Sequence, residues 1–538
     1  MTSSTAEDTV FNQPPPFTDV NLVTRDTPLR AAAGLSGAAG AALAAFGADW
    51  GTQERLALGR HANENPPRLR THDPQGRRLD LVEFHPAYHA LMAHSRAAGL
   101  AHSTWSGGSH VARAARLFVI SQVEAGHVCP LTMTHAAPAA LAAAPGLLAE
   151  WLPRIIAGPY DSRFLPFWEK SSVTLGMGMT EKQGGTDVRA NLTRATATGG
   201  DTYEITGHKW FFSAPMSDAF LVLAQATGGL TCFLVPRFRP DGTVNALHLQ
   251  RLKDKLGNRS NASSEVEFAR AFAWRVGEEG RGVPTIIEMV QLTRLDCAVS
   301  SAGLMRMALA LAVHHARHRT VFQKRLIDQP AMTAVLADLA LESEAATALS
   351  FRLAASFDRA KEDPLEAARA RLLTPAVKFS VCKAAPGFIY EAMEALGGNA
   401  YVEESPLPRL YREAPVNAIW EGSGNVMALD LLRAAGRDAA ATHAVIAALA
   451  QEARAVPGAR ETAQEIAEGL AGQDLESRAR YLTERLAALA AAAALAASAP
   501  EAVSHAFGTT RLLRPRAMFG ANSIAEPASL LDRALTEP

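Results

Sequence analysis

The residues best suited to chemistry lie in one short stretch, Trp420 to Asn425, which reads WEGSGN. Its carboxylate, Glu421, stands between an aromatic side chain and two glycines. Trp420 would partly dehydrate that carboxylate and make it a stronger base, which suits removal of a weakly acidic C–H proton. The structural alternative is that an acidic side chain here favours the positive end of a helix dipole.

The chain on either side of this stretch must position it. Pro415 discourages a helix before it, and Ser423 or Asn425 would cap a helix after it. Apolar residues then recur at helical spacing, at Val426, Leu429 and Leu432. We therefore expect Glu421 just ahead of a helix N-terminus.

A second candidate segment, Met177 to Asp187, reads MGMTEKQGGTD. Paired glycines let backbone amides approach a ligand closely, and the hydroxyls of Thr180 and Thr186 offer hydrogen bonds. The segment suits a phosphate- or flavin-bearing cofactor. A tight turn with Asp187 as a cap explains it equally well.

The third segment, Gly207 to Pro215, reads GHKWFFSAP and is expected to be a strand. Alternate residues of a strand share a face, so Phe211 and Ser213 would point the same way. The ring could then stack on a planar group while the hydroxyl binds its edge. Core packing of aromatic residues is the alternative for this strand taken alone.

Three histidines, His314, His315 and His318, could suggest a metal site. His314 and His318 fall one helical turn apart, but no carboxylate or third ligand accompanies them. We therefore expect a solvated helix face and no metal.

The elements around these segments predict an α+β fold. Residues 31–170 and 279–436 carry helical spacing, and residues 171–278 carry short β-branched or aromatic runs separated by Gly, Pro and Asn. Residues 1–30 are polar and Pro-rich and are expected to form an extended arm. Residues 437–538, rich in Ala, Leu, Arg and Glu, are expected to form an appended helical region.

Composition narrows the function classes. The 538 residues include 53 Lys+Arg and 54 Asp+Glu, so no overall charge points to nucleic acid or to a membrane surface. Four widely spaced cysteines, at 129, 232, 297 and 382, show no zinc or dithiol pairing. Reduced thiols and the absence of a secretory signal favour the cytoplasm, and the Ala-rich run 486–499 is too short to span a membrane.

Taken in order, the segments form a pattern that none forms alone. Together with LGGNAY (396–401), RLYRE (409–413) and IWEGS (419–423), the glycine-rich segment and the GHKWFFS strand closely resemble acyl-CoA dehydrogenase flavoproteins. The arm, the segment RLKDKLGNRSNA (251–262) and the long C-terminal extension resemble the AidB-type, alkylation-response branch of that family. The resemblance implies a helical N-terminal domain, a central β-barrel and a C-terminal helical bundle carrying Glu421.

The resemblance also implies roles for individual residues. Glu421 would be the catalytic base, since Thr293 occupies the position at which another branch places its base. Arg294 would lie on the CoA side of the substrate. FAD would be held by Met177, Met179, Thr180, Gly185, Thr186, Phe211, Ser213, Arg319, Phe322, Gly397, Trp420, Gly422, Ser423 and Asn425.

Two departures from the family pattern concern binding. Gln323 replaces a glycine in the run from Arg319 that reaches a neighbouring subunit's FAD, and Gln291 replaces an acidic residue near Arg294. The first leaves cofactor binding across a dimer intact, whereas the second puts efficient CoA-ester binding in doubt.

The resemblance implies oxidation of a short or branched, isovaleryl-CoA-like acyl-CoA by a homodimer or homotetramer, with an electron acceptor of unknown identity. The alternative is a double-stranded DNA-binding flavoprotein that protects against alkylation damage and retains only residual dehydrogenase activity. Its candidate phosphate contacts are Arg433, Arg511, Arg514 and Arg516. Acidic residues outnumber arginines beyond residue 437, which weakens this alternative.

Overall fold

A computed structural model describes residues 11–514 and 518–537. The first ten residues of the expected arm therefore lie outside the described part. The chain divides into two compact units. We call Glu54–Cys297 with Ile419–Gly422 the sheet unit, and Met1–Gln53 with Ala298–Ala418 and Ser423–Pro538 the helical unit.

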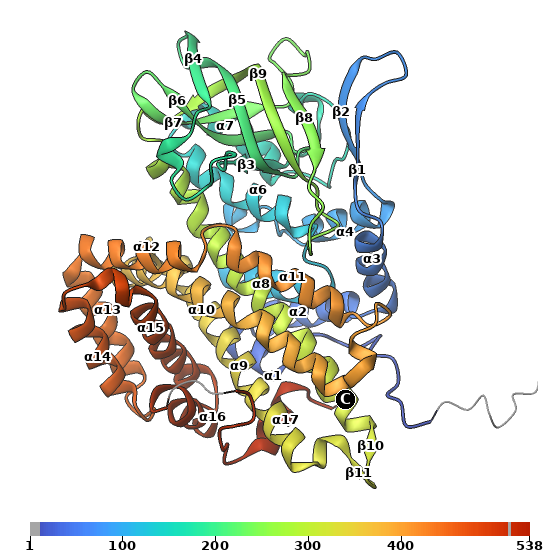
Figure 1. Ribbon diagram of the computed structural model, residues 1–538, viewed down its shortest axis with the longest axis vertical. Coiled ribbons are helices and arrows are strands. Elements are labelled where there is room, and N and C mark those ends of the chain that lie inside the picture. The colour runs from blue at the N-terminus through green and yellow to red at the C-terminus, as the bar shows by residue number, and fades with distance from the viewer. Residues whose placement is uncertain (1–10, 515–517, 538) are drawn as a thin grey trace, which may run out of the picture. The chain divides into compact units, whose positions relative to one another are not determined.

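The sheet unit is built around a closed barrel, drawn in green in Figure 1. Its strands are β3 (Leu175–Gly178), β4 (Arg194–Gly199), β5 (Thr202–Ser213), β6 (Ala219–Ala226), β7 (Gly229–Pro236), β8 (Leu247–Leu252) and β9 (Ser263–Val276). The pairing runs β6-β4-β5-β9-β7, and β6 pairs with β7 to close the ring. Strand β3 joins β6 in parallel, and β8 joins β9. The β-barrel expected from the sequence is confirmed.

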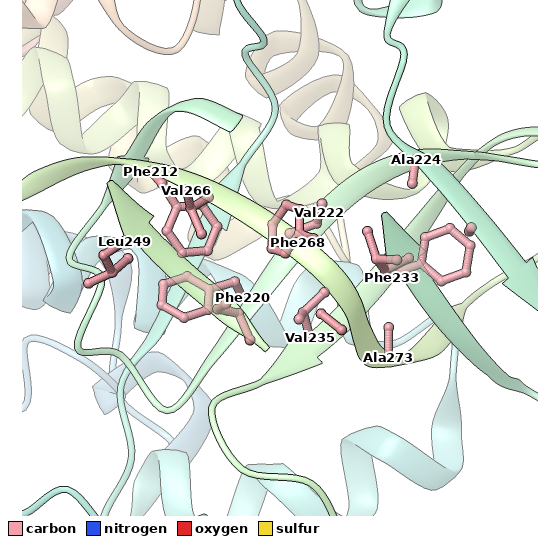
Figure 2. Packing of buried hydrophobic residues seen from close by; sticks show 14 of the residues in the cluster. Phe212, Phe220, Val222, Ala224, Phe233, Val235, Leu249, Val266, Phe268 and Ala273 are labelled. Carbon is pink, nitrogen blue, oxygen red and sulfur yellow. The ribbon is translucent and has the colours of Figure 1, made fainter. Parts of the chain in front are cut away.

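Aromatic and β-branched side chains fill the barrel, as Figure 2 shows. The rings of Phe212 and Phe220 have centroids 4.1 Å apart. A register shift between Lys209 and Phe212 changes the alternation along β5. Because of this bulge, Phe212 is buried in the barrel, whereas Phe211 is exposed and Ser213 is half-buried.

Helices and a hairpin complete the sheet unit. The helices are α4 (Pro86–Ala97), α5 (His110–Val123), α6 (Val128–Leu141) and α7 (Pro145–Ile156), and α3 (Gln53–Glu64) begins at its boundary. The hairpin of β1 (Arg68–His72) and β2 (Arg78–Glu83) corrects the expectation that residues 31–170 are all helical. It forms because Val82, with the partly buried Leu69, packs against the apolar cluster of the barrel.

The helical unit consists of long helices and one small hairpin. The helices are α1 (Thr27–Ala33), α2 (Gly37–Trp50), α9 (Pro330–Arg359), α10 (Pro364–Leu396), α11 (Leu407–Ile419), α12 (Gly424–Arg437), α13 (Ala439–Glu452), α14 (Ala459–Ala471), α15 (Leu475–Ser498), α16 (Glu501–Phe507) and α17 (Pro527–Ala534). The hairpin pairs β10 (Thr320–Val321) with β11 (Lys324–Arg325). Helix α8 (Gly282–His318) begins in the sheet unit and continues into the helical unit.

Local signals explain most of the helix starts. Asp363 accepts a hydrogen bond from the Leu365 amide at 2.8 Å and so caps α10, which begins at Pro364. Helices α10, α12 and α15 pack together, so the extension beyond residue 437 adds to the same bundle.

The expected break at Pro415 is wrong. Helix α11 continues through this proline to Ile419. Leu407, Leu410 and Ala414 are buried along one side of the helix, and this packing outweighs the hydrogen bond that the proline cannot donate.

Among the described residues, α8 is long and apolar enough to cross a membrane by length and composition. Its most apolar window is 94% buried inside the protein, as in a core helix.

Candidate active site

Glu421 is held by two consecutive residues of α8, one at its carboxylate and one at its backbone carbonyl. Thr293 Oγ1 donates to Glu421 Oε2 at 2.8 Å, and Arg294 Nε donates to the Glu421 carbonyl oxygen at 3.0 Å. Glu421 has a φ of 58°, in the left-handed region that side chains rarely adopt. The carboxylate is half-buried, so it is anchored but reachable.

Glu421 and Ser213 both act on one buried thiol, that of Cys129 in α6. Burial is the main reason why the pKa of this thiol is raised to about 12, and the nearby charge of Glu421 acts in the same direction. The charge of Lys255 and side-chain hydrogen bonds from Asn261 and Ser213 act in the opposite direction. The base candidate and the outward face of β5 therefore border the same small region of the sheet unit.

The glycine-rich segment folds back on strand β5. Glu181 and Gly184 exchange backbone hydrogen bonds, and the Trp210 amide donates to the Thr180 carbonyl oxygen at 2.8 Å. A Cβ on Gly185 would lie 2.4 Å from Thr180 Oγ1, so only glycine fits there. Asp187 makes no side-chain capping bond, so the expected Asx cap is absent.

A buried ion pair fixes this fold-back. Lys209 Nζ lies 2.8 Å from Glu181 Oε1, and both side chains are fully buried. Removing either charge would leave the other buried and uncompensated. The pair thus ties the glycine-rich segment to the strand that carries Phe211 and Ser213.

Phe211 is 50% exposed, as expected of an aromatic residue that contacts a ligand rather than the core. The ammonium of Lys253 lies 3.3 Å from the centroid of the Trp210 ring and 4.9 Å from that of Phe211. Met177 is buried in β3, Met179 and Thr180 are half-buried, and Gly185 and Thr186 are exposed. Phe211 and the residues of β3 and the glycine-rich segment therefore offer an exposed ring and several hydroxyls.

Trp420 and Gly422 also belong to the sheet unit, whereas the predicted contacts Ser423, Asn425 and Gly397 belong to the helical unit. Ser423 is the N-cap of α12 but makes no side-chain capping bond, and Asn425 lies in the first helical turn. Arg480 of α15 donates to Asn425 Oδ1 at 2.9 Å. Gly397 ends α10 with a φ of 65°, a conformation that favours glycine.

Arg319 precedes the β10–β11 hairpin, and Phe322 lies in its loop. Its two loop residues, Phe322 and Gln323, both have positive φ, and Phe322 is 93% exposed. The glycine that Gln323 replaces would relieve this strain. Asn12 of the arm accepts from the Thr320 amide at 2.6 Å, and its backbone carbonyl accepts from Arg319.

Sequence reasoning set Thr293 aside and left Cys129 and Asn261 out. Thr293 cannot serve as a base, but its hydroxyl can donate a hydrogen bond. The signal available in the sequence is a hydroxyl one residue before Arg294. Asn261 Oδ1 and Gln291 Oε1 are buried acceptors with no partner in the described part of the chain. No spacing in the sequence shows which buried amides stay unpaired.

A second carboxylate in the sheet unit is fully enclosed. Glu124 accepts from His127 Nδ1 at 2.6 Å, from Asn63 at 2.9 Å and from Ser260 at 2.8 Å. His127 Nε2 lies 2.8 Å from Ser95 Oγ. Although burial alone would raise it, hydrogen bonding and the charge of His127 hold the pKa of Glu124 at about 2.

The histidine face of α8 is only partly solvated. His318 is exposed, but His315 is buried, and His314 contacts the Pro15 carbonyl at 2.8 Å and the ring of Phe17. No group of three or more His, Cys, Asp or Glu side chains with metal-binding geometry occurs in the described residues.

The candidate phosphate contacts have different surroundings. Arg511 is paired with Asp338 and, at 3.1 Å, with Glu342, and its side chain is 8% exposed. The expectation that Arg511 contacts DNA phosphate is therefore corrected, because these ion pairs neutralise the charge that such a contact needs. Arg433 and Arg514 are exposed, and Arg516 lies outside the described residues.

Three family models match the chain. The adaptive response protein AidB N-terminal domain matches residues 12–162, the acyl-CoA dehydrogenase middle domain matches residues 176–271, and the acyl-CoA dehydrogenase C-terminal domain matches residues 280–436.

Individual relatives agree with these matches. The putative acyl-CoA dehydrogenase AidB of Escherichia coli (strain K12) is 53% identical over 438 residues, which is 80% of this chain and 81% of that protein. Acyl-CoA dehydrogenase family member 11 of Caenorhabditis elegans is 32% identical over 71% of this chain and 64% of its own length. The crystal structure of Caenorhabditis elegans ACDH-11 in complex with C11-CoA superposes with a TM-score of 0.84 at 25% identity, over 100% of this chain and 94% of that one.

A closed barrel with helices before and after it in the chain, and a carboxylate just ahead of a bundle helix, together define an acyl-CoA dehydrogenase fold. The chain belongs to the acyl-CoA dehydrogenase family, in its AidB branch.

Proposed function

We propose that this protein is an FAD-dependent acyl-CoA dehydrogenase that removes the α and β hydrogens of a short or branched, isovaleryl-CoA-like acyl thioester. The observation that carries the proposal is the placement of Glu421. Its half-buried carboxylate is anchored by Thr293 and borders the region that Ser213 and Cys129 share. A base held in this way suits abstraction of a weakly acidic C–H proton.

The residues present fit the cofactor. Phe211 offers an exposed ring, Thr180 and Ser213 offer hydroxyls, and Asn261 Oδ1 is a buried acceptor without a partner among residues 11–514 and 518–537. Gly185 and Thr186 would lie at the diphosphate, and Trp420, Gly422, Ser423 and Asn425 would line the same group. Gly397, Met177 and Met179 complete the set, with Arg319 and Phe322 supplied by a second copy of the chain. When bound, FAD supplies the acceptor for the β-hydrogen as hydride.

The chain's own residues would handle the proton. Glu421, ionised, takes the α-proton of the thioester and becomes a neutral acid. The Trp420 and Phe211 side chains would limit water at the reacting carbon, which protects the reaction from side paths. Arg294 stays a proposed substrate-side residue, although its Nε already holds the Glu421 carbonyl.

The substrate class rests on the family. ACDH-11, a structural relative, binds C11-CoA, so chain length has to be measured rather than assumed. The buried Oε1 of Gln291 has no partner among the described residues and would accept a hydrogen bond from a substrate group such as an amide N–H. Gln291 would do so as a neutral side chain, without the negative charge of an acidic residue.

The experiment is an anaerobic flavin titration. Purified protein should be yellow, and isovaleryl-CoA should bleach its absorbance in the wild type. In Glu421→Gln, which keeps size and polarity but not basicity, bleaching should slow by about 10²–10⁴-fold. Bleaching of this variant at the wild-type rate would exclude Glu421 as the base. A series of acyl-CoA esters up to C11 then identifies the preferred chain length.

The DNA-binding alternative now rests on fewer residues. Arg433 and Arg514 stay candidates, whereas Arg511 is engaged in ion pairs. Duplex binding measured at several salt concentrations tests it, because phosphate contacts predict a steep fall in affinity with salt. Arg433→Glu should reduce that slope, and an unchanged slope would remove Arg433 from the interface.

A further inference from the structure

The hydroxyl of Thr293 has two acceptors at almost equal reach. Its oxygen lies 2.8 Å from Glu421 Oε2 and 3.1 Å from the carbonyl oxygen of Val290, one turn earlier on α8. A threonine hydroxyl carries one hydrogen and two lone pairs, so it donates to only one of them at a time. Thr293 is 4% exposed, which leaves little water to share this task.

We propose that Thr293 is a positioning residue whose hydroxyl hydrogen switches acceptor with the protonation state of Glu421. This inference rests on the proposed function of Glu421 as the base. When Glu421 is ionised, Thr293 donates to Oε2. When Glu421 has taken a proton, its carboxyl donates to Thr293 Oγ1, and the hydroxyl hydrogen turns to Val290.

Only a hydrogen moves in this switch. Threonine is β-branched, and in a helix its oxygen is held in a few staggered positions, one of which bonds to the carbonyl one turn earlier. The heavy atoms therefore keep their places while both forms of the carboxyl stay hydrogen-bonded. A base that is solvated in both states needs no rearrangement of water during proton transfer.

The backbone of Glu421 is fixed by the next residue of the same helix. Arg294 Nε donates to the Glu421 carbonyl, and Glu421 has the left-handed φ of 58°. Thr293 thus holds the side chain while Arg294 holds the main chain. Charged and titratable groups near Glu421 in the described residues include Arg294 of α8 and Cys129 of α6, and the ammonium of Lys255 acts on the same thiol as Glu421.

The test compares Thr293→Val with Thr293→Ser in the FAD-loaded protein. Valine keeps the shape and removes the hydroxyl, whereas serine keeps the hydroxyl and removes the methyl group. A charge-assisted hydrogen bond favours the carboxylate, so valine should move the acidic limb of the flavin-reduction pH profile, where the base becomes protonated, up by about one pH unit. Serine should keep the wild-type limb.

A second readout does not depend on turnover. The carboxyl of Glu421 can be titrated by infrared difference spectroscopy of wild type against Glu421→Gln, and the same subtraction in the valine background reports the shift. An unshifted titration in Thr293→Val, or an equal shift in Thr293→Ser, would overturn the proposal.

The two inferences fail separately. Wild-type flavin reduction in Glu421→Gln would end the proposed function, yet an infrared shift confined to Thr293→Val would still assign Thr293 as the partner of that carboxyl. Loss of activity in Glu421→Gln, together with an unshifted infrared titration in Thr293→Val, would support the proposed function and overturn the proposed role of Thr293.

Discussion

Two glutamates of the sheet unit, Glu421 and Glu124, illustrate different uses of a held carboxylate. Glu124 is buried and accepts from side chains and from the backbone amides of Gly126 and His127. Glu421 is half-buried, and the side-chain donor assigned to its carboxylate is Thr293. The two carboxylates therefore differ in their exposure to solvent as well as in their hydrogen-bond donors.

The Ser95–His127–Glu124 chain has the distances of a nucleophile, a base and an orienting acid. Ser95 and His127 are nevertheless completely buried, so no substrate carbonyl can reach the serine. Hydrogen-bond geometry alone therefore does not identify an active site. A group for chemistry must combine a fixed position with a path to solvent.

The largest expected effect separates the two carboxylates by stability. Glu124→Ala removes a buried acceptor with several donors and should lower the free energy of unfolding by about 3–5 kcal/mol. Glu421→Gln should change it by less than about 0.5 kcal/mol. Urea unfolding of both variants measures this. Equal losses in the free energy of unfolding would mean that Glu421 is enclosed as tightly as Glu124.

Acid should act on the same contrast. The folded pKa of Glu124, about 2, lies below its ordinary value, so its contribution to stability is present above that ordinary value and is lost as pH falls toward 2. Wild type should therefore lose stability steeply below about pH 4.5, and Glu124→Gln, less stable at pH 7, should lose less. Thermal unfolding from pH 7 to pH 3 provides the comparison.

A smaller effect is expected at Ser95, where a substitution should lower stability without changing flavin reduction. Ser95→Ala removes one buried hydrogen bond to His127 and should cost about 1 kcal/mol. Flavin reduction should not change, and a fluorophosphonate probe should leave Ser95 of the native protein unlabelled. Labelling of the folded wild type would show that this site opens to solvent.

The smallest effect is expected in the segment that follows Glu421. Arg480→Ala frees Asn425, a proposed cofactor contact, and should weaken FAD retention by a few-fold, about 1 kcal/mol or less. Arg478→Ala, an exposed arginine of the same helix, serves as the control. Equal retention in both variants would limit the role of α15 to packing.

Much of the fold was predictable because its signals are local. Phe211 and Ser213 lie on the outward side of β5, as the strand alternation predicts for neighbours two residues apart, and the helix expected after Glu421 forms as α12. The signals that failed depend on distant packing. Pro415 lies inside α11, and the β1–β2 hairpin forms against the barrel, and neither contact can be seen in a short window.

The candidate site was predictable to a similar extent. Glu421, Phe211 and Ser213 could be selected by type and spacing, but Cys129, on which Glu421 and Ser213 both act, lies far away in sequence. Arg511 illustrates the reverse case. Its sequence neighbours favour a basic cluster, whereas its partners Asp338 and Glu342 come from α9, well over 150 residues earlier.

The left-handed backbone of Glu421 has a cost that glycine would not bear, on the order of 1 kcal/mol. Glu421→Gly should thus melt at a higher temperature than the wild type while being unable to take a proton. Stability alone would favour glycine at this position, and the proposed role of Glu421 as a base would account for a side chain that is kept at this cost.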